Sequence, residues 1–172
     1  DEPWFGVIFK PKIPRTLKGR LGDEAVDPLS QAEKTGRCHI YWESGLHASG
    51  VPPILAAMSA DIAIHSHLHS GTCAVECALA GIPTLLIDRE GWQRSRFYQL
   101  GEGMVVFADW PTLMDSLMEH WNQKEIPEFG VWPSPLLREL DPFWDGRGPE
   151  RMGNYLHWLV EGFEHGLERE SI

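Results

Sequence analysis

The sequence predicts an α/β protein with a doubly wound parallel sheet of about five strands. Five short apolar runs of the length of buried strands recur along residues 4–107, and segments with helical features separate them. The most informative stretch is residues 61–88, DIAIHSHLHSGTCAVECALAGIPTLLID, whose pattern is typical of a strand, a polar turn, a short helix and a second strand. Strands that alternate with helices in this way favour a parallel sheet.

The first two strands are predicted in residues 4–9 and 37–42. The run WFGVIF at 4–9 is continuously apolar, as in a central parallel strand, and it ends at Pro11, because proline cannot continue such a strand. Lys10 follows this strand, where its ammonium could meet an anion or lie in a solvated loop. Between the two strands, residues 29–34 show a weak helical pattern.

Residues 61–88 contain the unit around which the other elements are arranged. An apolar strand at 62–64 leads into a histidine-rich turn, and an alanine-rich helix follows that is small enough to lie against a sheet. Gly81 ends this helix, and residues 83–88 form a second buried strand. Ligands of open parallel sheets bind at the carboxyl ends of strands, so we expect a binding site at this turn.

The remaining elements surround this unit. A loop of small residues at 43–50 and a short helix at 54–59 precede it, and a short helix at 95–100 and a fifth strand at 104–107 follow it. Asp109 is expected to cap the next helix. The apolar face of that helix would contain Leu113, Leu117, Met118 and Trp121.

The C-terminal part of the chain has a different composition. Residues 122–149 are rich in proline and aromatic residues and are expected to wrap around the surface, whereas 150–168 show the periodicity of an amphipathic helix. The apolar side of that helix comprises Tyr155, Leu156, Leu159, Val160, Phe163 and Leu167. We expect one domain over residues 1–172, with 122–172 as a wrapping segment and closing helix. Because the chain starts at Asp1 in a strand pattern, we expect it to be a fragment of a longer protein.

Composition excludes several classes of protein. The 172 residues, 42% hydrophobic and 23% charged, are typical of a globular protein with one good core. A formal net charge of −10 argues against a general nucleic-acid-binding protein, since such binding rests on clustered lysine and arginine. No apolar run is long enough to cross a membrane, and three cysteines are too few for a disulfide framework. We expect Cys73 and Cys77, four residues apart on a small helix, to face the core as thiols rather than to bind metal, which favours a reducing, cytoplasmic compartment.

A phosphate is one ligand that the turn at 65–72 could bind. Ser70, Gly71 and Thr72 would place backbone N–H groups and two hydroxyls at a helix N-terminus, which favours an anion, and glycine allows a close approach. Glu76 lies four residues after Thr72 and shares its face, where it could accept hydrogen bonds from a ribose diol. The alternative is that Ser70 is an ordinary N-cap and Glu76 a solvated surface residue.

A metal ion is the second ligand to consider. His65, His67 and His69 alternate, and in an extended segment their imidazoles would point to one face, as a zinc site requires. The predicted strand ends near Ser66, however, and no acidic residue within the turn completes the set. We expect no metal here, and expect one histidine to hydrogen-bond a ligand or to cap the strand end.

The segment SGTCAVECALAGIPTLLID resembles a known motif. It is similar to the donor-nucleotide motif of GT-B glycosyltransferases, S/G-G-T-x-x-x-E-x-x-x-x-G-x-P, versions of which occur in lipid-A-disaccharide synthase, in the sugar transferase of lipid II synthesis and in UDP-GlcNAc 2-epimerase. The layout of residues 5–120 is also similar, above all to enzymes of bacterial surface and capsular polysaccharide synthesis. The resemblance implies a Rossmann-like, nucleotide-sugar-binding C-terminal domain of a two-domain transferase.

The resemblance also implies roles for individual residues. Ser70, Gly71 and Thr72 would hold the phosphates of an activated sugar, Glu76 would bind the ribose hydroxyls, and Lys10 would neutralise phosphate charge. No catalytic residue is assigned, because the acceptor site and often the catalytic base of such enzymes come from a preceding N-terminal domain. A bound metal or other cofactor is not expected, since the nucleotide-sugar is itself the substrate.

Further contacts with the donor are implied around the same turn. His65 or His67 could touch the phosphate or the sugar, and the loop at 43–50 would flank the base. Three residues at the end of the following strand could meet the sugar: Asp88, Arg89 and Glu90.

Two alternatives from other classes stay open at the level of sequence. One is a metal-dependent hydrolase that uses His65, His67 and His69. The other is a non-enzymatic interaction module in which the tryptophan-rich region 121–158 and the acidic surface bind a partner. No transmembrane segment is expected, although the expected N-terminal half could supply a peripheral membrane contact.

Overall fold

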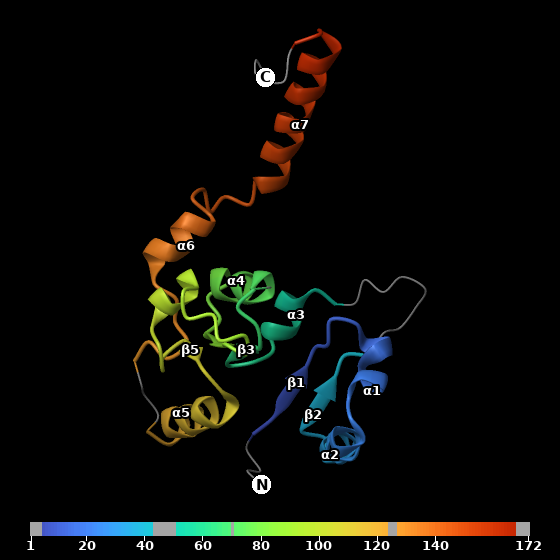
Figure 1. The fold of residues 1–172 in the computed structure, drawn as a ribbon, viewed down its shortest axis with the longest axis vertical. Coiled ribbons are helices and arrows are strands. Elements are labelled where there is room, and N and C mark those ends of the chain that lie inside the picture. The colour runs from blue at the N-terminus through green and yellow to red at the C-terminus, as the bar shows by residue number, and fades with distance from the viewer. Residues whose placement is uncertain (1–4, 43–50, 70, 124–126, 168–172) are drawn as a thin grey trace. The chain divides into compact units, whose positions relative to one another are not determined.

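The computed structural model describes residues 5–42, 51–69, 71–123 and 127–167. Figure 1 shows the order of its helices and strands. The chain divides into two compact units, Asp1–Trp132 and Pro133–Ile172. Within the described ranges, none of the helices combines the length and the apolar character that crossing a bilayer requires.

The first unit begins with a two-stranded parallel sheet. Strand β1 (Val7–Phe9) pairs in parallel with β2 (Cys38–Ile40), so that Val7 lies beside Cys38. A short 3-10 helix η1 (Pro14–Thr16), the helix α1 (Leu17–Arg20) and the longer α2 (Asp23–Lys34) connect them. The sequence pattern indicates a helix only over residues 29–34, after Pro28. Helix α2 begins six residues earlier and contains Pro28 in its interior.

A three-stranded parallel sheet follows in the order β3–β4–β5. It consists of β3 (Ala63–His65), β4 (Thr84–Ile87) and β5 (Val106–Phe107). Its helices are α3 (Pro53–Ala57) before β3, α4 (Thr72–Leu79) between β3 and β4, the 3-10 helix η2 (Arg96–Leu100) before β5, and α5 (Trp110–Gln123) after it.

The α/β class with parallel strands is confirmed, but the strands form two small sheets among the described residues. The first strand, expected at residues 4–9, is Val7–Phe9, and the expectation that it is buried is wrong. In the described part of the sheet β1 pairs with β2 alone, and Val7 and Phe9 are 43% and 36% exposed. A strand of three residues with one neighbour is an edge strand, so its apolar composition does not by itself bury it.

The core lies between the three-stranded sheet and α5. Its buried cluster comprises Leu85, Ile87, Phe107, Leu113, Leu117 and Phe129. Strand β4 is buried along its whole length because strands flank it on both sides and side chains cover both of its faces. Phe5, just before β1, also packs against this cluster and so connects the N-terminal segment to the second sheet. Each such buried aliphatic or aromatic side chain contributes about 1.5–3 kcal/mol.

Helix α5 begins as the sequence predicts. The Thr112 N–H donates to Asp109 Oδ1 at 2.8 Å, which is the expected N-cap and lowers the pKa of the Asp109 carboxyl. Leu113 and Leu117 are buried on the predicted apolar face, whereas Trp121 is 45% exposed. The predicted face is therefore correct for its first two turns.

Within residues 127–132, three residues are buried in the core rather than on a wrapping surface: Phe129, Gly130 and Trp132. Phe129 and Trp132 are 3% and 4% exposed, and the indole Nε1 of Trp132 donates to the carbonyl of Thr84 at 2.9 Å. Gly130 accepts from the N–H of Thr84 at 2.7 Å and donates to the carbonyl of Met104 at 3.0 Å. This segment completes the hydrogen bonding at the start of β4.

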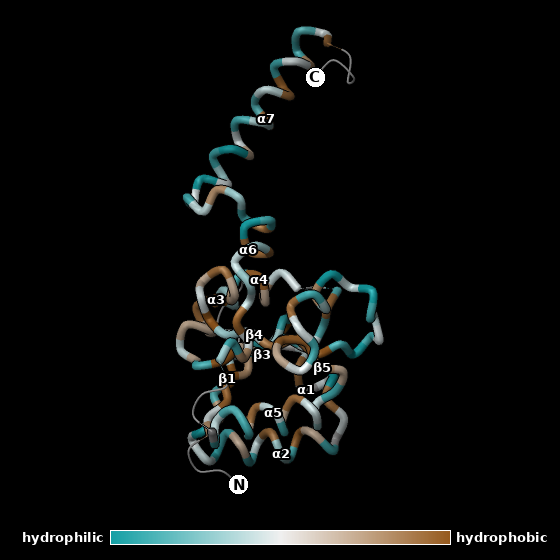
Figure 2. Tube along the Cα trace, turned by 90° about the vertical axis from the view of Figure 1, so that its left-hand side faces the viewer, coloured by the Kyte–Doolittle hydropathy of each residue, from teal (hydrophilic) through white to brown (hydrophobic). Residues whose placement is uncertain are grey.

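The second unit contains α6 (Ser134–Leu140) and α7 (Gly148–Glu164). Helix α6 lies in a stretch that the sequence pattern leaves irregular. Helix α7 is the predicted amphipathic helix, and Figure 2 shows hydrophobic residues recurring along it among hydrophilic ones. Its large apolar side chains are exposed, including Tyr155 at 54% and Phe163 at 79%.

Candidate functional site

The turn after β3 is held by a carboxylate from the loop after β4. His67 Nδ1 lies 2.7 Å from Glu90 Oε1, and the N–H of Leu68 donates to Glu90 Oε2 at 3.4 Å. The hydrogen bond from His67, with that of the Leu68 N–H, lowers the pKa of the Glu90 carboxyl. Leu68 is 1% exposed, so its side chain anchors the turn while Glu90 binds the backbone and the imidazole above it.

The three histidines of this turn have different environments. The rings of His65 and His67 are 6.2 Å apart and perpendicular, His67 contacts Glu90, and His69 stacks on Trp92 at 4.4 Å between ring centroids. The strand ends at His65, so the alternation of side chains stops before the other two histidines. Among the described residues, no group of three or more His, Cys, Asp or Glu side chains is arranged to hold a metal ion.

Helix α4 starts immediately after this turn, with Gly71 as its N-cap residue. A Cβ added to Gly71 would lie 3.0 Å from Cε2 and Cζ of Phe97, closer than real Cβ atoms ordinarily approach another atom. Any larger residue here would require the ring of Phe97 in η2 to shift by a few tenths of an ångström, and the sequence pattern does not indicate this contact. Ser70, the first residue of the predicted phosphate site, lies outside the described residues.

Thr72 and Glu76 occupy one exposed face at the start of α4. Their spacing of four residues places Glu76 one turn below Thr72, as the sequence predicts. Among the described residues, no side-chain hydrogen bond caps the helix at its N-terminus, and backbone N–H groups in the first turn of a helix have no partner within it. The exposed hydroxyl of Thr72 and these N–H groups can therefore donate to an anion.

The buried side of α4 is built from small residues and a thiol. Cys77 is 5% exposed, and burial, together with the nearby Cys73 and Glu76, raises the pKa of its thiol to about 11. Such a thiol stays protonated and unreactive at neutral pH. All three cysteines are free, in agreement with the sequence prediction.

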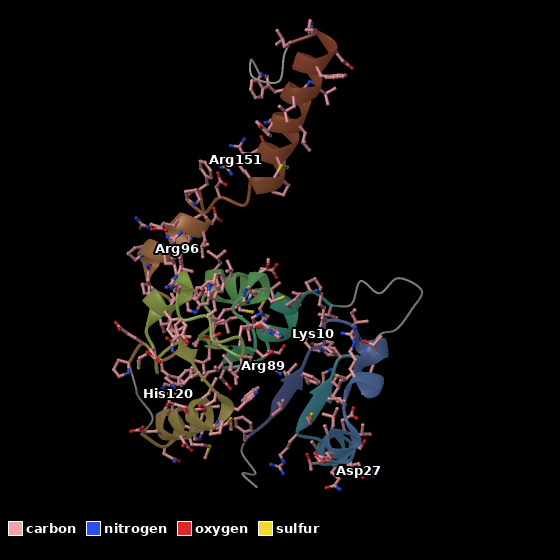
Figure 3. The ribbon with its side chains drawn as sticks, in the orientation of Figure 1. Lys10, Asp27, Arg89, Arg96, His120 and Arg151 are labelled. Atoms are coloured by element: carbon pink, nitrogen blue, oxygen red, sulfur yellow. The ribbon has the colours of Figure 1, made fainter. Side chains whose placement is uncertain are left out.

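Lys10 lies in the other sheet. Its Nζ donates to the carbonyl of Pro11 at 3.3 Å at the end of β1, whereas α4 packs beside β3 and β4. Figure 3 labels Lys10 together with Arg89, an exposed cation two residues after the end of β4. The structure thus brings Gly71, Thr72 and Glu76 together with the histidine turn, while Lys10 belongs to the β1–β2 sheet.

A buried pair, Asp88 and Tyr98, stands at the carboxyl end of β4. Asp88 is 4% exposed, and its Oδ2 accepts from the hydroxyl of Tyr98 at 2.8 Å. Within the described part of the chain its Oδ1 is buried without a hydrogen-bond partner. The position of Asp88 after a strand was visible in the sequence, but its pairing with a tyrosine in η2 was not, because no local pattern links the two.

Comparisons with models of protein families, with curated proteins and with solved structures found no match for this chain. A functional proposal therefore depends on the chemistry of its own residues.

Proposed function

We propose that this chain is the nucleotide-sugar-binding domain of a GT-B glycosyltransferase, which transfers a sugar during bacterial surface polysaccharide or glycolipid synthesis. Residues 71–76 would bind the phosphates and the ribose of the donor. The acceptor site would come from an N-terminal domain of a longer, cytoplasmic protein, and no metal or other cofactor is required.

One observation carries the proposal: α4 opens with Gly71 and Thr72 directly after the carboxyl end of the parallel strand β3, and exposes Thr72 and Glu76 on one face. In parallel α/β folds this edge of the sheet binds ligands, and a helix N-terminus favours a phosphate. The carboxylate of Glu76 is one turn away, where it can accept hydrogen bonds from the diol of a ribose attached to that phosphate. This combination suits a nucleoside diphosphate better than an inorganic anion.

Two features support a preformed site. Glu90 restrains the turn before α4 through His67 and the N–H of Leu68, and Phe97 packs over Gly71. Restraint of this kind reduces the entropy that a ligand must overcome on binding. The exposed guanidinium of Arg89 supplies positive charge at the same edge of the sheet.

The proposal also includes the arrangement of the five strands and the role of Lys10. Phe5 joins the β1 segment to the core beneath β4 and β5, which supports a single Rossmann-like arrangement of the five strands. Lys10 follows β1, and its Nζ would leave the Pro11 carbonyl to neutralise phosphate charge on donor binding.

Calorimetric titration of the chain with UDP, GDP, CMP and their sugar conjugates tests the proposal. We expect one of these series to bind, and we expect Glu76→Gln to weaken that binding about tenfold, because a hydrogen bond to a charged group contributes about 1.5–3 kcal/mol. The 2′-deoxy nucleotide should bind the wild-type protein as weakly as the ribonucleotide binds Glu76→Gln.

The matched control is Glu24→Gln, which changes an exposed glutamate on α2 and should leave the affinity unchanged. Absence of binding by all three nucleotide series at millimolar concentration would contradict the proposal. A ribonucleotide affinity that Glu76→Gln does not alter would contradict the assigned role of Glu76.

A further inference from the structure

Helix α7 carries a continuous apolar stripe on one side. Met152, Leu156, Leu159 and Phe163 follow one another at intervals of four, three and four residues, the spacing of the core positions of a coiled coil. Met152, Leu156 and Phe163 are 60%, 53% and 79% exposed, and Leu159 is partly exposed. Tyr155 and Val160 border the stripe and are each 54% exposed.

The opposite side of α7 is mainly polar. It carries Glu150, Asn154, His157, Glu161 and Glu164, all of them exposed. Salt bridges lie on the polar side, between Arg147 and Glu150 and between His157 and Glu161 when the imidazole is protonated. The helix is thus polar on one side and apolar on the other, as in a helix that buries one face against a partner.

The size of the stripe matches one half of a small dimer interface. At these exposures each of the six large apolar side chains presents on the order of 100 Å² of surface, so together they present roughly 600 Å². A second identical face would bring the buried total to about 1,200 Å², the lower end of specific interfaces. A stripe of this area is also at the upper end of the apolar patches that monomers expose, at about 300–600 Å².

The stripe is complementary to itself when a second copy runs in the opposite direction. Its midpoint falls between His157 and Trp158, so Met152 would pack against Phe163 of the second copy, and Leu156 against Leu159. Val160 of the second copy would lie over Gly153, where an added Cβ would meet nothing within 4 Å. Antiparallel pairing therefore avoids stacking Phe163 on Phe163 and places Val160 over a glycine.

The charged residues of α7 lie off the stripe, and Arg151 is paired with Asp145 and lies over the ring of Phe143. The formal net charge of −10 and the three glutamates on α7 make an anionic membrane surface a poor partner. We propose that α7 pairs with α7 of a second copy of this chain, antiparallel, to form a homodimer.

Sedimentation equilibrium of the 172-residue chain at about 1–100 μM tests this proposal, since a small interface has micromolar affinity. We expect a reversible monomer–dimer equilibrium. Leu156→Glu, which places a charge in the stripe, should raise the dissociation constant at least tenfold. Asn154→Glu, on the polar side of the same helix, should change it less than twofold, and circular dichroism should show equal helix content in both variants.

Crosslinking distinguishes the direction of pairing. An equimolar mixture of Met152→Cys and Phe163→Cys should form a disulfide-linked dimer, whereas each variant alone should not. In the antiparallel pair two copies of residue 152 are separated by 11 residues of helix, or about 16 Å. The wild-type chain, with its three native cysteines, controls for background oxidation.

Several results would overturn the proposal. A chain that stays monomeric up to the highest concentration would do so, as would a dimer that Leu156→Glu leaves intact. Crosslinking of either single variant with itself would contradict the antiparallel direction. A monomer that binds anionic vesicles through α7 would replace the second copy with a membrane surface.

Discussion

Asp88 and Tyr98 form a polar contact at the carboxyl end of β4 in the first unit. The carboxylate of Asp88 is nearly fully buried at the end of β4, and the hydroxyl of Tyr98 is its side-chain partner. The backbone N–H of Asp88 also donates to the carbonyl of Phe107 at 2.8 Å. The pair thus joins β4, β5 and η2 at the edge of the sheet where we place the donor.

Tyr98→Phe should lower the free energy of unfolding by roughly 1–3 kcal/mol, the cost of leaving a buried acceptor without its hydrogen bond. Urea denaturation followed by circular dichroism measures this change. Tyr41→Phe is the matched control, because Tyr41 contacts His39 through its ring, and its loss of a hydroxyl should change stability by less than about 0.5 kcal/mol. Equal effects of the two substitutions would show that the contact with Asp88 contributes nothing.

The same pair predicts a dependence on alkaline pH. Burial, followed by the hydrogen bond to Asp88 and the charges of Asp88 and Glu102, raises the pKa of Tyr98 from 10.0 to about 12. A raised pKa means that the stabilisation is fully present below pH 10.0 and is lost as pH rises through about 12. The difference in stability between wild type and Tyr98→Phe should therefore shrink over this interval, with tyrosinate absorbance reporting the ionisation. A difference that stays constant would show that Tyr98 does not titrate there.

At the scale of elements, the segment around Gly130 determines how β4 begins. Gly130 has a φ of +72°, and a Cβ there would lie 3.1 Å from the backbone nitrogen of Thr84 and 3.1 Å from Cβ of Pro83. Both the left-handed backbone and the close approach require glycine. The segment reaches across 46 residues of sequence to pair with β4, so no local pattern could have revealed it.

Gly130→Ala should destabilise the protein by about 2–4 kcal/mol, the sum of left-handed backbone strain and overpacking against β4. Gly103→Ala is the matched control, since Gly103 also has a positive φ, at +77°, but an added Cβ there would meet nothing within 4 Å. This control substitution should lower the free energy of unfolding only by the strain of the left-handed backbone, about 1 kcal/mol. Thermal unfolding of the two variants compares them directly, and equal midpoints would contradict a close contact at Gly130.

At the scale of the whole molecule, the two proposed activities lie in different units. The nucleotide site belongs to Asp1–Trp132, and the self-pairing face of α7 belongs to Pro133–Ile172. Leu156→Glu should therefore raise the dissociation constant of the dimer at least tenfold and change the nucleotide affinity less than about twofold, a difference below about 0.4 kcal/mol. Calorimetry and sedimentation on the same preparation measure both.

The reciprocal substitution is Glu76→Gln, which should weaken nucleotide binding and leave the dimer unchanged. Loss of both properties in either variant would show that the two sites depend on one another. Loss of only the expected property in each variant would support two separate sites.

Local chemistry in the sequence was sufficient to locate most elements. The strand–turn–helix–strand unit, the cap at Asp109, the helix end at Gly81 and the amphipathic pattern of α7 depend on neighbouring residues, and the structure contains all of them. The shared face of Thr72 and Glu76 follows from helical spacing alone. The proposed phosphate-and-ribose site is thus visible in the sequence, apart from Ser70, which lies outside the described residues.

Tertiary structure decided which side chains meet and which are buried. Glu90 holds a histidine 23 residues earlier, Trp132 donates to a carbonyl 48 residues earlier, and the apolar β1 has exposed side chains. Hydrophobic periodicity records that a segment has an apolar face, but the partner of that face depends on contacts between residues far apart in the chain. For the same reason, the sequence determined the histidine turn and the start of α4. Only the tertiary structure gave the three histidines different partners and placed Glu90 and Phe97 around that turn.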